Sequence, residues 1–440
     1  MTCPYGHGSA SGKPPSRRGF LGAVGGLLAV AGSVAATPAP TLAGIPARTR
    51  VDPFFGPHQS GIASPQQSHS YFVAFDLVAK KRTEIVAMLQ AWTEAAARMN
   101  VGQTAGKLGE DPSKVAPDGG SALGLLPARL TITFGFGPGL FVKDGVDRYG
   151  LAAQRPVQLV DLPKFQGDQL EPTRSGGDLS VQACADDPQT AFNAVRELVR
   201  LADGVAQLRW AQSGFTANTP AGETGRNLMG FKDGTNNPPH ASQNRPATPD
   251  VPRGFDDVVW AGDEGPAWMH GGSYLVARRI RISLEHWDRT EVDFQEEVVG
   301  RHKYSGAPIG QKDEFDPLGL DREDKDGNST IAETSHVRLG SALANDGAQI
   351  LRRAYSYNDG ASFTAERWPP WRQGIMFDSG LFFLCYQRDP RTGFIKIFET
   401  MAKMDALNQF TTHNGSAVFA CPGGVTEGQY IGQRLFETTS

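Results

Sequence analysis

The feature that most constrains the fold of this chain is a diverged internal duplication. Residues 70–74 (SYFVA) are matched by residues 273–277 (SYLVA), which begin 203 positions later. A second pair of segments, 179–192 and 381–394, repeats at an offset of 202 residues. Two matches at nearly one offset indicate that a single architecture is used twice. The alternative, which the sequence leaves open, is chance similarity between strand-rich segments.

Each half has the pattern of a sheet with helices packed on it. Apolar residues alternate in the predicted strands and recur every three or four positions in the predicted helices. The first half has predicted strands at 71–78, 129–136 and 178–184 and helices at 83–99 and 188–202; the second has strands at 273–284 and 380–387 and helices at 291–299 and 394–410. This order predicts an α+β fold of two ferredoxin-like halves, each an antiparallel sheet with packed helices.

Two long stretches between these elements, 203–265 and 301–335, are predicted to be irregular. Loops of that length inside a compact domain are usually functional or disordered. We therefore expect the functional residues to lie in or beside them.

The N-terminus has the layout of an export signal. Arg17 and Arg18 stand in the sequence SRRGFL, followed by an uncharged Gly/Ala/Leu/Val stretch to Ala36 and by small residues to Ala43. This matches the twin-arginine pattern and predicts a periplasmic or extracellular protein, with cleavage after Ala36 or after Ala43. A Sec signal and a retained helix are the alternatives. That route carries folded proteins, commonly with a cofactor already inserted, and no later stretch predicts a membrane anchor in the processed protein.

The predicted domains are therefore the signal at 1–43, an N-terminal ferredoxin-like domain at 44–215 and a C-terminal one at 216–440, which would carry the cofactor. The chain has 43 basic and 47 acidic side chains, and loss of residues 1–43 would leave 40 basic ones and a formal charge of −7. An acidic protein without a Lys/Arg block is a poor partner for a phosphate backbone, so nucleic-acid binding is excluded.

The four cysteines support neither a disulfide framework nor a metal site. Cys3 lies in the predicted signal, which leaves Cys184, Cys385 and Cys421 at wide spacing and without a C-x-x-C motif. Zinc-ribbon, iron–sulfur and covalent c-type haem sites are therefore unsupported. We expect the three remaining cysteines to be buried apolar thiols.

Three short segments carry residues suited to chemistry. Asp233 lies between glycines in the segment 227–238, His336 follows an acidic loop, and Arg352 and Arg353 precede an aromatic run. Glycines beside an acid let a flat ligand approach the backbone. Taken singly, these segments are also compatible with an Asp-Gly turn, a surface or core histidine and a surface strand.

Taken in order, the motifs resemble the dye-decolourising peroxidase family. They are G-F-K-D-G-T at 230–235, S-H-V-R-L at 335–339, L-R-R-A-Y-S-Y at 351–357, L-F-F-L-C-Y-Q-R-D at 381–389, W-D-R-T at 287–290 and the G-R-x-K stretch at 300–310. The resemblance covers nearly the whole processed chain and is strongest to the exported subgroup that includes the deferrochelatase/peroxidases of bacterial iron uptake. It implies the dimeric α/β barrel-like superfamily and one non-covalent haem b per chain.

The resemblance also implies roles for individual residues. Those roles are His336 as the proximal ligand of the haem iron, Asp233 as the distal acid, Arg352 as the distal arginine, Gly234, Thr235 and Asn236 as lining of the distal haem face, Arg338 as a propionate partner and Asp405 as the acid that hydrogen-bonds the proximal histidine. Arg353 is the alternative distal arginine, and Ala354 replaces a glycine that is usual in the family.

The implied activity is a peroxidase that forms compound I with hydrogen peroxide and then oxidises dyes and other aromatic donors. A carboxylate as the proton acceptor predicts an acidic pH optimum. Candidate surface relays, chosen by residue type alone, are Trp260, Trp268, Trp368, Trp371, Tyr355, Tyr357 and Tyr386, for which core packing is the alternative.

Three other functions stay open. They are iron release from haem by a deferrochelatase in an exported iron-uptake system, a haem-carrying partner of such a system without turnover, and a non-haem binding protein. Iron-uptake components and a second copy of the chain are further candidate partners.

Overall fold

The computed structural model describes residues 49–217, 219–220, 222–239, 250, 254–365 and 373–437. The predicted signal, Trp368 and Trp371 lie outside these residues, so export stays a prediction. Among the described residues, no helix combines the length and the apolar character needed to cross a bilayer.

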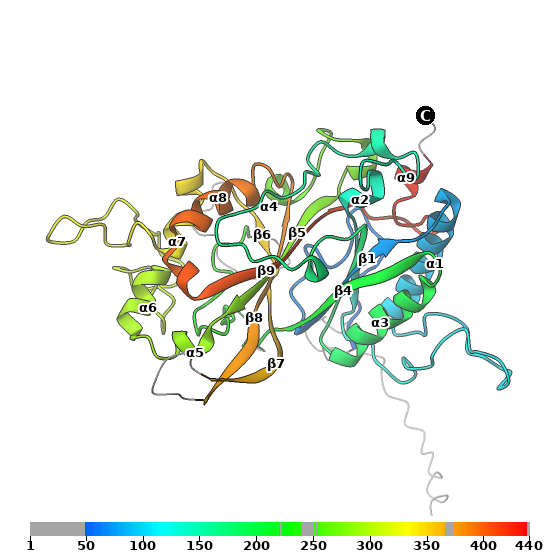
Figure 1. Ribbon diagram of the computed structural model, residues 1–440, viewed down its shortest axis with the longest axis horizontal. Coiled ribbons are helices and arrows are strands. Elements are labelled where there is room, and N and C mark those ends of the chain that lie inside the picture. Colours follow the sequence, from blue (N-terminus) through cyan, green and yellow to red (C-terminus); the bar gives the residue numbers. More distant parts are fainter. Residues whose placement is uncertain are drawn as a thin grey trace, which may run out of the picture. The chain divides into compact units, whose positions relative to one another are not determined.

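The first half is a four-stranded antiparallel sheet in the order β2-β3-β1-β4. Figure 1 shows α1 and α3 beside β1 and β4. Helix α1 connects β1 to β2, and α3 connects β3 to β4. The bounds are β1 (His69–Leu77), α1 (Arg82–Asn100), β2 (Thr131–Phe136), α2 (Pro138–Phe141), η3 (Ala152–Gln154), η4 (Pro172–Arg174), β3 (Leu179–Ala185), α3 (Pro188–Leu201) and β4 (Ala206–Phe215). Helix α3 begins where it does because Asp187 accepts a hydrogen bond from the Thr190 amide at 3.0 Å and Pro188 occupies the first turn.

The second half repeats this sheet in the order β9-β5-β8-β7, so that β5, β7, β8 and β9 correspond to β1, β2, β3 and β4. Its bounds are α4 (Phe255–Val259), η5 (Ala267–Met269), β5 (Ser273–Ile282), α5 (Leu284–Trp287), α6 (Val292–Val299), α7 (His336–Leu339), η6 (Leu343–Asn345), β6 (Leu351–Arg352), β7 (Tyr355–Ala365), β8 (Gln373–Gln387), α8 (Phe394–Met404), η7 (Ala406–Gln409), β9 (Thr411–Cys421) and α9 (Gln433–Phe436). Helix α8 corresponds to α3, whereas the short helices α5 and α6 stand where the first half has the 19-residue α1.

The two sheets join edge to edge into a closed antiparallel barrel. Phe136 of β2 pairs with Ala420 of β9, and Phe215 of β4 pairs with Ser356 of β7. The barrel interior is filled by fully buried aromatic side chains, among them Phe72, Phe382 and Phe419. The predicted fold class of two ferredoxin-like halves is therefore confirmed. The domain limits at 215/216 stay a prediction, because residues 46–440 form one compact unit.

Outside the barrel, the first half carries a packed core. Alternate residues of β1 and β3, such as Phe75 and Val181, face α1 and α3. Trp92 of α1 is 1% exposed, lies 5.2 Å from the Phe75 ring and donates from its indole nitrogen to the Leu198 carbonyl at 2.8 Å. The corresponding face of the second half holds the cavity described below.

Two predictions about the chain need correction. The segment 203–265 was expected to be irregular, but it contains β4. Gln212 and Gly214 occupy buried positions of this strand while Leu208 and Phe215 are exposed, so the apolar alternation typical of a strand is lost. The helix expected over 394–410 ends at Met404, because Asp405 adopts an extended conformation and begins η7. The three described cysteines are buried free thiols, as predicted.

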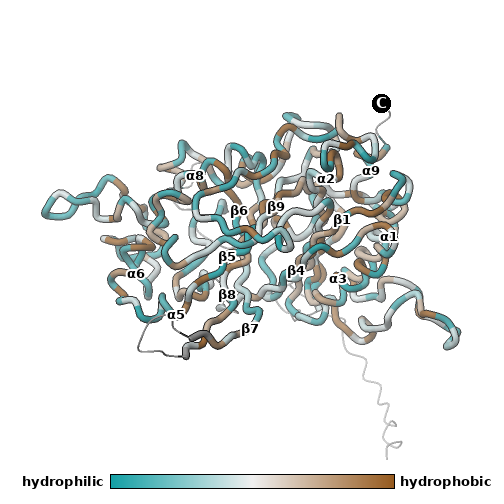
Figure 2. The backbone as a smooth tube through the Cα atoms, in the orientation of Figure 1, coloured by the Kyte–Doolittle hydropathy of each residue, from teal (hydrophilic) through white to brown (hydrophobic). Residues whose placement is uncertain are grey.

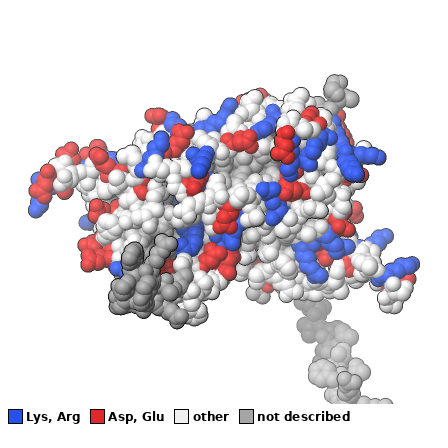
Figure 3. Space-filling model, in the orientation of Figure 1, with Lys and Arg blue, Asp and Glu red and all other residues white. Residues whose placement is uncertain are grey.

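Charged side chains of both signs are spread over the surface. In Figure 3, basic and acidic side chains are interspersed over the visible face and form no single-sign stripe. The loop between α6 and α7, which projects at the left of Figure 1, is mostly hydrophilic in Figure 2.

Candidate active site

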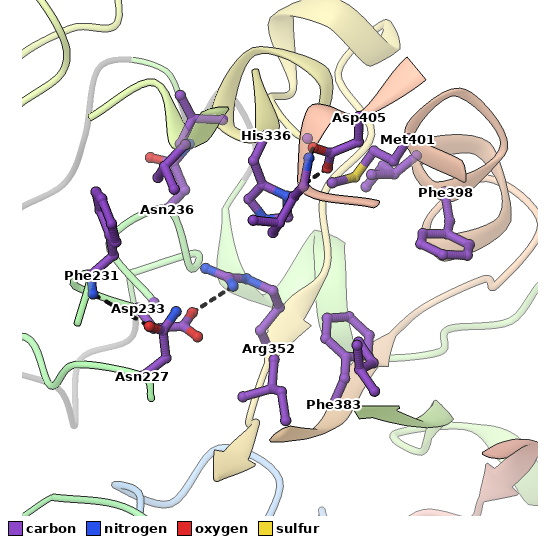
Figure 4. Close-up of a pocket in the computed structure, with 18 of the residues that line it drawn as sticks. Asn227, Phe231, Asp233, Asn236, His336, Arg352, Phe383, Phe398, Met401 and Asp405 are labelled. Carbon is purple, nitrogen blue, oxygen red and sulfur yellow. Dashed lines mark hydrogen bonds and ion pairs between the residues drawn. The ribbon is translucent and has the colours of Figure 1, made fainter. Parts of the chain in front are cut away.

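A large cavity lies on the outer face of the second sheet, under α7 and α8. Its floor is apolar and its far wall is polar; Figure 4 shows Phe383 and Phe398 on one side and Asn227 and Asp233 on the other. The empty space, including the part open to solvent, is about 1680 Å³. An apolar lining with a few convergent polar groups is typical of a small-molecule site.

His336 stands at the first position of α7 and faces this cavity. Its Nδ1 lies 2.7 Å from Oδ2 of Asp405, which also accepts the Leu407 amide through Oδ1 at 2.8 Å. The Ala406 amide donates to the Thr334 carbonyl at 2.9 Å, which ties η7 to the residues before α7. Asp405 therefore holds the ring in a fixed orientation.

This partnership sets the chemistry of the imidazole. A carboxylate can only accept, so Nδ1 carries the proton and Nε2 presents a lone pair to the cavity. Burial alone would lower the pKa of His336, but the negative charge of Asp405 outweighs it and raises that pKa above the ordinary value. A histidine with a carboxylate on its other nitrogen is the usual arrangement of a metal ligand.

Across the cavity, Asp233 and Arg352 form an ion pair with 2.6 Å between Oδ1 and a guanidinium nitrogen. Asp233 follows a chain reversal at Gly230 and precedes Gly234, and both glycines have positive φ (85° and 103°) that other residues rarely adopt. The two side chains are 21% and 25% exposed, so they remain accessible from the cavity.

The loop that carries Asp233 is fastened at two points. Asn237 exchanges hydrogen bonds with the backbone of Arg352, at 2.7 and 2.9 Å. Glu314 accepts from Thr235 at 2.8 Å and from Lys232 at 2.6 Å. Burial would raise the pKa of Glu314, but these donors lower it, so the carboxylate stays charged and holds the loop.

Arg301 adds a further cation to the wall. It is 5% exposed and donates to the carbonyls of Gly306 and Glu314 at 2.8 Å each. Burial lowers its pKa to about 10, which leaves it positively charged at neutral pH.

The structure brings together most residues that the motifs singled out. Lining the cavity with His336 are Asp233, Gly234, Thr235, Asn236, Arg352 and Asp405. Arg353 is not brought there: it is 3% exposed and donates to Ser64 and Gln67 on the other side of the strand. Arg338 is also not in the wall, because its guanidinium donates to the carbonyls of Ile331 and Leu320.

Several wall residues were missed by sequence reasoning. Arg301 and Phe383 lie inside quoted motifs but were given no role, and Phe398, Met401 and His413 lie in segments without a motif. The predicted strand at 380–387 was the available signal for Phe383, since every second residue of a strand shares one face.

Comparisons with known proteins match the chain over nearly its whole length. Residues 59–216 match the family described as "Dyp-type peroxidase, N-terminal", and residues 224–426 match "Dyp-type peroxidase, C-terminal". The chain is 38% identical to the dye-decolorizing peroxidase of Thermobifida fusca, over 97% of this chain and 98% of that one. It is 34% identical to the deferrochelatase of Escherichia coli K12, over 96% and 97%.

Solved structures give the same result. A DyP-type peroxidase from Streptomyces coelicolor superimposes with a TM-score of 0.78 at 39% identity, covering 91% of this chain and 100% of that one. Ferric DtpA from Streptomyces lividans gives a TM-score of 0.77 at 38% identity, with the same coverage.

Proposed function

Because the chain belongs to the Dyp-type peroxidase family, whose members are oxidoreductases acting on peroxide, we propose that Asp233 and Arg352 activate hydrogen peroxide beside a non-covalent haem b held by His336. The oxidised site then takes electrons from dyes and other aromatic donors. The observation that carries this proposal is the Asp233–Arg352 pair facing the same cavity as a histidine oriented by a carboxylate.

The residues present suit a haem. The cavity offers one imidazole lone pair, an apolar floor for a macrocycle, and cations at Arg301 and Arg352 for acidic groups. Oδ1 of Asn236 is buried and has no hydrogen-bond partner among the described residues, so it can accept a hydrogen bond from peroxide bound in the cavity. A haem held by His336 would supply an iron that binds peroxide and would hold the oxidising equivalents that peroxide yields.

The chain supplies the proton transfer and the charge stabilisation. Oδ1 of Asp233 is held by Arg352, which leaves Oδ2 to accept the proton from one peroxide oxygen and to pass it to the other, which leaves as water. Arg352 stabilises the negative charge that develops on the leaving oxygen. The fastening of the 233–237 loop to Glu314 and to the Arg352 backbone keeps both groups in place before peroxide arrives.

Bulky donors need a route for electrons from the surface. Of the aromatic candidates chosen by residue type, Tyr355, Tyr357 and Tyr386 are fully buried, and Trp260 and Trp268 are 8% and 3% exposed. Trp260 stacks on His58 with 3.8 Å between ring centroids. The described candidates can therefore act as interior steps, and the surface contact belongs to other residues.

The proposal is tested by loading the full chain with haem and following its absorption spectrum and the peroxide-dependent bleaching of an anthraquinone dye. We expect a one-to-one haem complex that turns over the dye only with peroxide, faster at acidic pH. A haem complex with no peroxide-dependent oxidation of any aromatic donor would contradict it.

Iron release from haem is the second candidate function, favoured by the deferrochelatases among the relatives. It uses the same cavity, as does a carrier role. Extraction of iron-free protoporphyrin from the haem complex after incubation with a reductant and an iron chelator would support it; intact haem alone would exclude it. Iron-uptake partners belong to this second candidate, whereas export by the twin-arginine route is proposed for either function.

A further inference from the structure

A second histidine, His413 of β9, lines the same cavity without belonging to the motifs. It pairs with Ile280 in the sheet, and its ring lies 4.8 Å from that of Phe398 on the apolar side of the cavity. Its Nδ1 lies 3.2 Å from Nε of Arg278. A polar ring on an apolar floor needs a reason, because an unused donor there costs stability.

Arg278 is itself fully buried. Its guanidinium forms an ion pair with Asp168 and donates to Ser416 at 3.0 Å. The guanidinium carbon also lies 5.5 Å from the ring centroid of Phe165 and 5.3 Å from that of Phe398. The side chains of Arg278 and Asp168 are 0% and 1% exposed. A pair so deeply buried requires full compensation by its neighbours, so the contact with His413 is part of what holds the arginine there.

The arginine determines which nitrogen of His413 carries the proton. A guanidinium can only donate, so Nδ1 must accept and the proton of the neutral ring sits on Nε2. Burial and the neighbouring Arg278 charge also lower the pKa of His413 well below its ordinary value, which keeps the ring neutral. With Nδ1 occupied, the Nε2–H group is the one left for the cavity.

We propose that this Nε2–H group donates a hydrogen bond to a carboxylate oxygen of the molecule bound in the cavity. A carboxylate is the acceptor that benefits most, because the imidazole it meets is polarised by a cation behind it. Two molecules could supply that oxygen: the haem itself through a propionate, or an aromatic donor that bears an acid. The inference rests on the proposed haem function of the cavity.

The first half of the chain shows that the fold does not need these polar groups. The position that corresponds to Arg278 is Phe75, which packs on Trp92. The position that corresponds to His413 is Ala206, which pairs with Leu77 as His413 pairs with Ile280. Apolar side chains thus satisfy the same sheet positions, and the histidine and arginine serve the cavity.

The test uses two variants that separate the two nitrogens. His413→Asn places an amide oxygen near the position of Nδ1 and can still accept from Arg278, but it removes the donor at Nε2. His413→Gln places its amide near Nε2 and keeps a donor toward the cavity. The full chain is loaded with haem b or with haem dimethyl ester, whose carboxylates are blocked, and the rate of haem transfer to apomyoglobin is measured.

If the propionate is the acceptor, His413→Asn releases haem b about tenfold faster than the wild type. His413→Gln then releases haem b at nearly the wild-type rate. The wild type and both variants release the dimethyl ester at similar rates. If an acidic donor is the acceptor, haem release is unchanged and the KM for ferulate rises about tenfold in His413→Asn, while the KM for methyl ferulate does not.

Equal haem release and equal KM values in wild type and His413→Asn would overturn the inference. So would an equal loss for haem b and its dimethyl ester, which would indicate packing alone. These outcomes leave the proposed function intact, because that function is tested separately, by haem binding to the wild type and to His336→Ala and by peroxide-dependent oxidation of an aromatic donor.

Discussion

The outer faces of the two sheets are built on one plan and used differently. In the first half, Phe75 and Val181 are covered by α1 and α3, and Trp92 fills the space between them. In the second half, Phe383 stands at the position of Val181 but faces an open cavity. The short helices α5 and α6 do not cover the sheet as α1 does, so a face that is core in one half becomes a binding site in the other.

The two faces therefore differ in what their side chains do. Apolar packing on the first sheet stabilises the fold directly. On the second sheet the same face carries histidines, an acid and arginines that need fixed partners, and such breaks in the local pattern are expected at functional sites. Substitutions on the first face should therefore change stability, and substitutions on the second should change binding and catalysis.

The largest expected effect is on catalysis, at the outer face of the second sheet, which holds the cavity and is called the hollow face below. Arg352→Ala should lower kcat/KM for peroxide by about 10²–10³-fold, because it removes the charge that stabilises the leaving oxygen. Stopped-flow mixing of the haem-loaded variant with peroxide measures this. Lys396→Ala, which removes a cation from a solvent-facing pair with Asp346, is the control and should react like the wild type. A normal rate in Arg352→Ala would contradict the assignment of catalysis to the second face.

The next effect compares an aromatic residue of the first face, Trp92, with one of the second face, Phe383. Trp92→Ala should lower the free energy of unfolding of the haem-free protein by about 3–5 kcal/mol. Phe383→Ala should lower it by at most about 2 kcal/mol, because one side of that ring already lacks protein neighbours, but it should weaken haem binding. Urea denaturation of both variants measures the difference; equal losses would show that the cavity face is packed like the first.

The carboxylate behind His336 gives a smaller effect on binding. Asp405→Asn should weaken haem binding by about 10–100-fold, since a partner on the second ring nitrogen both orients the ligand and raises its basicity. Competition for haem with apomyoglobin measures the change. Asp405→Glu is the control, and recovery of affinity there would distinguish a charge requirement from a packing defect.

The smallest effect is a pH dependence of haem binding. The pKa of His336 is raised, and a protonated imidazole cannot bind a metal. Haem affinity should therefore be constant above the raised pKa and fall by about tenfold for each pH unit below it, with the onset above the ordinary value near 6.5. Titrations from pH 5 to 8 check this, and Asp405→Asn should move the onset to lower pH. An onset that does not move would contradict the assigned cause.

Much of this could be predicted from the sequence. The offset of about 202 residues predicts the repeated ferredoxin-like halves, and the motifs around Asp233 and His336 single out two sides of one site. The choice between Arg352 and Arg353 could not be made with certainty from the motif. The structure distinguishes them, because Arg352, the last residue of β6, faces the cavity, whereas Arg353, which follows β6, points away from it toward Ser64 and Gln67.

The rest depends on contacts between distant parts of the chain. The partner of Arg278 lies 110 residues away at Asp168, and His413 lies 135 residues from Arg278. No local pattern marks such a cluster, and β9 follows a helix without a turn signal. The strand β4 was missed for a related reason. Strand prediction relies on apolar alternation, which β4 lacks because polar Gln212 is buried and apolar Leu208 is exposed.

The central claim is that the hollow face binds haem through Nε2 of His336. It is tested most directly by titrating the full chain and its His336→Ala variant with haem and following the Soret band. The wild type should saturate at one equivalent with a five-coordinate spectrum, and the variant should show no stable complex until imidazole is added. A variant that still binds a full equivalent of five-coordinate haem without imidazole would contradict the account.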